Sequence, residues 1–345
     1  MKNRNYLILA MLLTMIVGMF FIMLYATDGR YNAYWDAISL LIITIPLVSF
    51  YIIAFPDINQ TSGLAINQYK MRWLRDLTIL LGTSATFMGF LFMWAILREF
   101  NPSITQISNE LSSSLAVAFL TMIYASGISF SFYIINIFLK DDTSNTKEMG
   151  SRYISNTVSF LLVFLIHFFT LFHLERITGK NPISVLGFND QSLYLLIIGI
   201  LLFFNFQNNN SVSMLIKNLF CDCKESADSI KSQIEAIKKT KRFIGALNML
   251  AMVYFPTALF ISLYFYIDDS SKIFSLLVPG TRMMLWCYFI MIIFTVLEGK
   301  YNYKLYQAEG RVENDSMFLA KYVALPTILY FMMVILLFIL FNVLF

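Results

Sequence analysis

Charged residues are scarce in this 345-residue chain, at 13% of the total, whereas soluble proteins have about a quarter. Hydrophobic residues make up 58%. This composition excludes an ordinary soluble domain. The apolar stretches are continuous rather than alternating, which excludes a membrane β-barrel and predicts an all-α, polytopic membrane protein.

Cysteine and histidine are also rare. The three cysteines offer no disulfide framework, and no histidine lies near Cys221 or Cys223. His167 and His173 are six residues apart, which puts them on different faces of a helix. We therefore expect no metal site and no cofactor. His167 lies in an apolar segment, where it is either a candidate proton relay or simply bonded to the next helix.

Catalytic motifs are missing. The chain has no phosphate-binding glycine loop, no metalloprotease motif and no nucleophile elbow. We therefore expect that it is not an enzyme. The net charge of +4 arises from basic residues between apolar segments, so it does not indicate a nucleic-acid partner.

Nine apolar segments are long enough, or nearly so, to cross a bilayer, which takes about 20 residues each. The sequence thus predicts about nine transmembrane helices, and we expect the eighth to be broken near Pro279-Gly280. They cover residues 6–26, 37–55, 77–97, 113–139, 154–172, 192–206, 243–267, 273–297 and 322–345. The polar segment 98–111 reads as a loop between the third and fourth.

Lysine and arginine fall unevenly on the two sides of these segments. With the N-terminus inside, 19 of the 25 basic residues lie on the inner side and six on the outer side. Because cytoplasmic loops are enriched in basic residues, this predicts a cytoplasmic N-terminus and an outside C-terminus.

The inner segment 207–242 carries an apolar stripe with a spacing of four, three, four and three residues. This period predicts a cytoplasmic amphipathic helix over about 209–242. It either extends a neighbouring span and packs beside it, or docks a partner. The stripe consists of Ile216, Phe220, Cys223, Ala227, Ile230, Ile234 and Ile237.

The two halves of the chain have a similar layout. Residues 81–102 can be laid over residues 250–271 without a gap, which indicates a degenerate parallel repeat. We expect a four-helix unit over 1–140, a second unit over 141–321, and an extra helix over 322–345.

Small and hydroxylated residues are concentrated in segments 77–97 and 113–139. Small residues allow helices to approach closely in lipid, and hydroxyls give an interface a polar lining. We expect Gly82, Gly89 and Gly127 to pack helices. The expected ion-pathway or partner-facing residues are Thr83, Thr86, Thr121, Tyr124 and Ser126. The alternative is that these hydroxyls only bond back to their own helices.

Residues 36–139 resemble the MotA/TolQ/ExbB family of ring-forming motor subunits. The first motif is Leu81-Gly82-Thr83 with Gly89 further on. The second is Ala118-Phe119-Leu120-Thr121-Met122-Ile123-Tyr124-Ala125, in which Met122 replaces the second threonine of the family's usual pair. Segment 36–56, ending in Ala54-Phe55-Pro56, is also similar.

The resemblance implies a multi-pass subunit of the inner membrane of a bacterium. Such subunits surround a single-span partner of the MotB/TolR/ExbD type, which carries one aspartate, and form homo-oligomers or larger complexes. Thr83 and Thr121 would then bond that acid. The short inner loop 57–75 leaves no room for the large domain of flagellar stators.

These features lead to one expected function and its rivals. The chain is expected to couple proton or sodium flow to mechanical work or transport, as part of a membrane complex. The alternatives are a secondary transporter built from the degenerate repeat, or a scaffold that conducts nothing.

Overall fold

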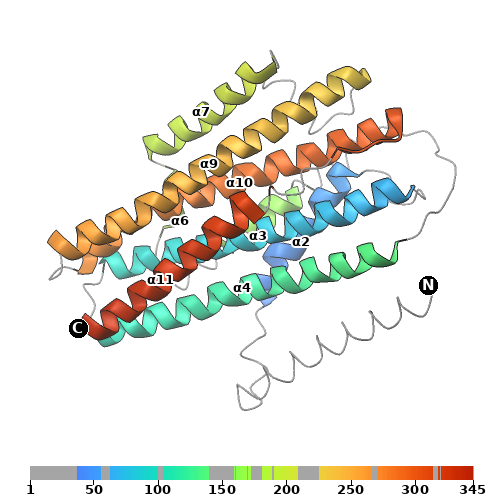
Figure 1. Ribbon diagram of the computed structural model, residues 1–345. Helices are drawn as coiled ribbons and strands as arrows, with labels where there is room; N and C mark the ends of the chain where they lie inside the picture. Colours follow the sequence, from blue (N-terminus) through green and yellow to red (C-terminus); the bar gives the residue numbers. More distant parts are fainter. Residues whose placement is uncertain are drawn as a thin grey trace.

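The computed structural model describes residues 37–55, 63–99, 104–139, 159, 161–168, 170–171, 181–188, 190–208, 225–265, 270–313, 318 and 320–344. All regular structure in these ranges is helical, as predicted (Figure 1). The expected first span, 6–26, lies outside the described residues, and of the fifth, 154–172, the structure describes residues 159, 161–168 and 170–171, with 161–168 helical.

Eight helices and one π-helical turn form the described part of the bundle. They are α2 (Ala37–Ala54), α3 (Leu64–Glu99), α4 (Ile104–Phe138), α6 (Pro182–Leu186), α7 (Gln191–Asn208), α9 (Ala227–Phe265), α10 (Ser270–Glu309), the π-helical turn η2 (Ala320–Ala324) and α11 (Leu325–Leu344). The expected spans 37–55 and 192–206 match α2 and α7 closely.

Four of the described helices are long and apolar enough to cross a membrane. They cover Leu64–Arg98, Leu120–Ile137, Ala227–Ile261 and Lys272–Glu309. Three shorter apolar helices lie at Ile38–Ala54, Gln191–Gln207 and Lys321–Leu337. The chain is therefore a helical membrane protein, while the count of nine spans and their orientation remain predictions.

Cross-helix contacts give the relative directions of these helices. Trp73 contacts Thr295 and Trp94 contacts Phe274, so α3 and α10 are antiparallel. Lys241 contacts Glu298 and Tyr254 contacts Leu276, so α9 is also antiparallel to α10. Continuing in this way, α3, α9 and α11 run in one sense, and α2, α4, α7 and α10 run in the other (Figure 1). This pattern agrees with simple alternation of the predicted spans.

Three boundaries predicted from the sequence are wrong. Helix α10 continues through Pro279 without a break, because a buried membrane helix tolerates a missing N–H when neighbouring groups satisfy the backbone. Helix α3 begins at Leu64 instead of 77, and α4 begins at Ile104, inside the expected loop 98–111. Both errors arise because helices continue into polar sequence beyond the apolar stretch.

Helix α9 includes residues 227–242 of the segment 209–242 that was expected to be an amphipathic helix. It begins at Ala227 and runs without interruption into the expected seventh span. Ile230, Ile234 and Ile237 of the stripe are buried, so this part extends the span and packs on its neighbours. Ile216, Phe220 and Cys223 lie outside the described residues.

Helices α3 and α10 occupy the centre of the bundle. Aromatic rings fill the space where α3, α9, α10 and α11 meet: the ring of Tyr330 lies 4.5 Å from Phe87, 5.2 Å from Phe90 and 4.8 Å from Phe255, centroid to centroid. Such tilted contacts add to the burial of apolar area. The bundle is therefore held together mainly by helices that are distant in sequence.

The direction of the helices is consistent with the expected repeat. Helices α2, α3 and α4 run in alternating senses, and α7, α9 and α10 run in the same three senses. An inverted repeat would give the second set the opposite senses, so these directions allow the parallel form, and the repeat itself stays a prediction.

Candidate functional site

The small and hydroxylated residues predicted from the sequence meet where α3 contacts α4. A Cβ atom built on Gly82 would lie 2.2 Å from the Cβ of Ala125, which is too close for any side chain. Gly82 thus marks the close approach of the two helices. The other two glycines expected to pack helices, Gly89 and Gly127, have no atom within 4 Å of such a Cβ.

The threonines at this contact are enclosed by the chain itself. Thr83, Thr86 and Thr121 are all at most 4% exposed. The Thr83 hydroxyl lies 4.0 Å from the sulfur of Met122, to which it donates. The Thr121 hydroxyl donates to Ser39 Oγ of α2 at 3.4 Å. These hydroxyls therefore lie between α2, α3 and α4, where they bond other groups of the same chain.

Helix α4 has a second, open face. Only 17% of its apolar window is buried, against 44–78% for the other three spanning helices. Ser126, Gly127 and Ser131 are exposed there, and Tyr124 is half-buried at its edge. Ser131 Oγ donates to the carbonyl of Gly127, its own helix, at 3.0 Å. We call the three exposed small residues the open α4 face. Of the five expected ion-pathway or partner-facing residues, Ser126 is the one that points outward.

His167 lies apart from this contact. Its Nδ1 is 2.8 Å from the carbonyl of Val163, one turn earlier in the same helix, and its ring stands edge-on to Phe289 of α10. Among the described residues, no group of three or more histidine, cysteine, aspartate or glutamate side chains could hold a metal ion.

A buried polar stripe on α10 was missed in the sequence. Thr281, Tyr288, Thr295 and Asn302 recur every seven residues, and each is at most 2% exposed. A seven-residue spacing returns to the same helix face every two turns. The seven-residue spacing could have revealed this stripe in the sequence. It was overlooked because threonine and tyrosine do not stand out in an apolar helix.

The first half of the stripe, Thr281 and Tyr288, is bonded to α11. Trp94 Nε1 donates to the hydroxyl of Tyr330 at 2.9 Å, and Tyr330 is 2.8 Å from Thr281 Oγ1. Because Thr281 Oγ1 donates to the carbonyl of Leu277, the Tyr330 hydroxyl donates to Thr281. Tyr288 likewise bonds Thr327 of α11 at 3.0 Å. These bonds fix α11 to the centre of the bundle.

The second half of the stripe, Thr295 and Asn302, leads into a charged cluster. Asn302 Nδ2 donates to Tyr69 Oη of α3 at 3.0 Å, and its Oδ1 accepts the backbone N–H of Glu313. One turn away, Lys241 Nζ lies 2.6 Å from Glu298 Oε2, with side chains 8% and 9% exposed. A buried pair such as this requires both charges, because either alone would be left without compensation.

Among the described residues, one fully buried side chain has two polar atoms without a hydrogen-bond partner. Asn248 of α9 is 0% exposed, and neither its amide nitrogen nor its amide oxygen has a hydrogen-bond partner. Such groups are rare in folded proteins, and an ordered water often satisfies them. No signal in the sequence distinguished it from other polar residues of helices.

No family model matches the chain, and neither the curated proteins nor the solved structures contain a match to it. The resemblance of residues 36–139 to motor subunits therefore rests on its motifs alone.

Proposed function

We propose that this chain is the membrane subunit of an ion-motive-force-coupled complex, in which the open α4 face receives the transmembrane helix of a single-span partner. The observation that carries the proposal is the exposure of small residues on a helix of spanning length. Gly127 and Ser131 are four residues apart and both exposed, which is the spacing at which small residues let a second helix approach closely.

The acid for ion coupling would come from the partner. Among the described residues, the carboxylates of α3, α9 and α10 lie outside the apolar stretches 77–97, 243–267 and 273–297; they are Asp76, Glu99, Asp228, Glu235, Glu298 and Glu309. An acid at mid-membrane is costly and is kept where it has a role. A titrating group at that depth would thus belong to a second polypeptide of the MotB/TolR/ExbD type.

Ser126 is the first hydroxyl such an acid would meet. A hydroxyl both donates and accepts, so Ser126 could bond the acid in either protonation state. Thr121 lies behind it and already bonds Ser39. Ion passage along Thr83 and Thr121 would therefore require α2 or α4 to shift, while binding of the partner would not. The driving force is on the order of 2.3 kcal/mol per charge per 100 mV.

A pair of glycine variants tests the binding step. Gly127→Leu adds bulk to the open α4 face, and a Cβ atom at this position has no atom of another part of this chain within 4 Å. Gly199→Leu is the matched control, since Gly199 of α7 is equally exposed and equally free of neighbours. We expect a smaller membrane protein to copurify with the wild type and with Gly199→Leu, and to be lost from Gly127→Leu.

The second candidate is a permease built from the repeat. It is favoured by the shared helix senses of α2–α4 and of α7, α9 and α10. A wild-type chain that is alone and monomeric in mild detergent would support this candidate and contradict the first.

A further inference from the structure

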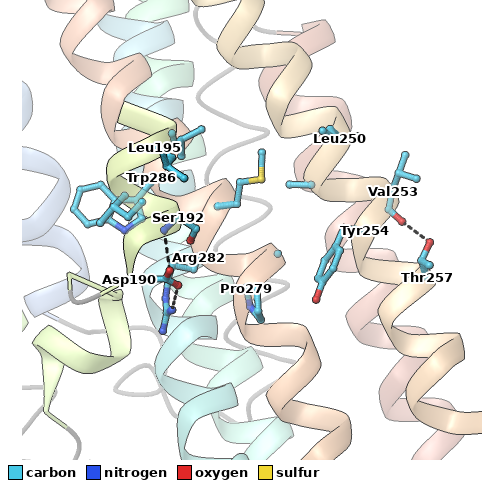
Figure 2. A pocket seen from close by; sticks show the side chains of 15 residues that line it. Asp190, Ser192, Leu195, Leu250, Val253, Tyr254, Thr257, Pro279, Arg282 and Trp286 are labelled. Carbon is cyan, nitrogen blue, oxygen red and sulfur yellow. Dashed lines mark hydrogen bonds and ion pairs between the residues drawn. The ribbon is translucent and has the colours of Figure 1, made fainter. Parts of the chain in front are cut away.

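A groove separates α7 from α9 at one end of the bundle, with α10 as its floor (Figure 2). Its volume is about 740 Å³, within the range of about 300–1,000 Å³ typical of ligand sites. Toward the other end the two helices close on each other, where the rings of Phe203 and Phe243 stack 4.2 Å apart. The groove is therefore a wedge, wide at the start of α7 and shut further along it.

The lining of the groove has two chemically different parts. Most of it is apolar and comes from all three helices, including Leu195, Leu196, Leu250, Val253, Met283 and Trp286. A polar edge is made of Asp190 and Ser192 at the start of α7 and Arg282 of α10 (Figure 2). A ligand that matches this lining has a long apolar part and a compact polar end.

The groove opens toward the membrane. Leu195, Leu250 and Val253 on its walls are 60–69% exposed, and α9 and α10 are of membrane length and composition, while α7 is a shorter apolar helix. The polar edge lies near the boundary of the hydrocarbon layer: the 18 residues of α7 that follow Asp190 cover about 27 Å, close to the roughly 30 Å of that layer. A ligand would thus enter sideways from one leaflet.

The charge at the polar edge selects the headgroup. The guanidinium of Arg282 is already occupied, because it donates to the carbonyls of Ser184 and Val185 and to Asp190 Oδ2. Its side chain is 16% exposed, whereas that of Asp190 is 37% exposed. The carboxylate accepts the N–H of Ser192 at Oδ1 and Arg282 at Oδ2, and the Ser192 side chain bonds it as well. Its two oxygens have about four acceptor sites, so one is left for a ligand. The carboxylate of Asp190 is therefore the group that faces a ligand, and its negative charge favours an ammonium.

We propose that this groove binds a phospholipid with an amine headgroup, phosphatidylethanolamine, with one acyl chain between α7 and α9 and the ammonium on Asp190. A transmembrane helix fits less well. Helices approach closely over small residues, and the walls here are bulky except at Ala251 and Gly280. A flexible chain adapts to such walls.

The proposal can be tested by native mass spectrometry of the intact chain. The chain is supplied with either phosphatidylethanolamine or phosphatidylglycerol, and the two lipids have identical acyl chains. Leu195→Trp fills the groove, and Leu202→Trp is its control, a leucine of the same helix that is 50% exposed outside the groove. We expect the wild type and Leu202→Trp to retain phosphatidylethanolamine. Leu195→Trp should retain it about tenfold less, the loss expected when two methylene groups are kept out.

Asp190→Asn tests the headgroup separately, since it removes the charge and keeps the shape. We expect this variant to bind both lipids equally, whereas the wild type prefers the ethanolamine lipid. Equal thermal stability of Leu195→Trp and Leu202→Trp would show that both fold. The proposal is overturned if these two folded variants retain equal lipid, if the wild type has no headgroup preference, or if Leu195→Trp loses a polypeptide instead.

Discussion

The ammonium of Lys241 lies 2.6 Å from the carboxylate of Glu298, and it also stands 4.3 Å from the ring centre of Phe318. This pair joins α9 to α10. It lies where the apolar stretches of both helices end and the helices continue into polar sequence, so it links the apolar part of the bundle to its polar extension.

Removing one member of this pair should be costly. Glu298→Gln leaves Lys241 buried without its partner charge, and we expect a loss of about 3–5 kcal/mol in the free energy of unfolding. Glu235→Gln is the control, because Glu235 pairs with Lys239 on the exposed surface of α9. Exposed pairs of this spacing contribute only about 0.3–0.5 kcal/mol. Denaturant unfolding in detergent would compare the two; equal losses would contradict the buried role of Glu298.

The Gly82 contact predicts a steric effect. Gly82→Ala places a methyl group where the Cβ of Ala125 already lies, so we expect α4 to be displaced and the free energy of unfolding to fall by about 1–3 kcal/mol. Gly89→Ala, where no atom is near, should stabilise the helix by up to about 1 kcal/mol. Adding Ala125→Gly to Gly82→Ala should restore part of the loss. No restoration would mean that the two helices do not meet at this point.

Tyr330→Phe should weaken the bundle through its hydrogen bonds alone. The change keeps the ring but leaves the buried N–H of Trp94 without an acceptor, at a cost of about 1–3 kcal/mol. Tyr254→Phe is the matched control, since its hydroxyl bonds the carbonyl of Leu276 in an exposed position. Thermal unfolding would measure both, and a neutral Tyr330→Phe would contradict the network.

The Asp190–Arg282 pair predicts a dependence of stability on pH. The backbone N–H of Ser192, followed by its side chain and by Arg282, holds the pKa of Asp190 below its ordinary value of 3.8. A lowered pKa means that the ionised carboxylate stabilises the fold above 3.8, and that this contribution is lost as pH falls through the lower, folded-state value. The stability difference between the wild type and Asp190→Asn should therefore be largest near neutral pH and shrink in acid. A difference that is constant over this range would contradict the role of the charge.

The sequence predicted the type of most described helices because apolar length and period are local properties. The stripe through Ile230, Ile234 and Ile237 is an example, since its spacing alone required a helix with one buried face. The helix ends were predicted less well. At Leu64 and Ile104 the helices begin in polar sequence before the apolar stretch, so the pattern of apolar residues alone placed both starts too late.

The candidate site was only partly accessible from the sequence. Small residues and hydroxyls could be located in α3 and α4, but the side on which each lies depends on the partner helices. Thr121 is enclosed because Ser39 of α2 lies against it, and Ser126 is exposed because no described helix covers that face. The pairing of Arg282 with Asp190, 92 residues away, could not be read from either residue alone.

Site-specific photo-crosslinking at Ser126, in membranes of the cells that make this protein, tests the central claim most directly. A photoreactive residue there would report what lies on the open α4 face, and one at Leu202 on the lipid-facing side of α7 would serve as the control. The account predicts an adduct between Ser126 and a smaller membrane protein whose single span carries an acid, and none at Leu202. Adducts at Ser126 only with lipid, or only within this chain, would contradict it.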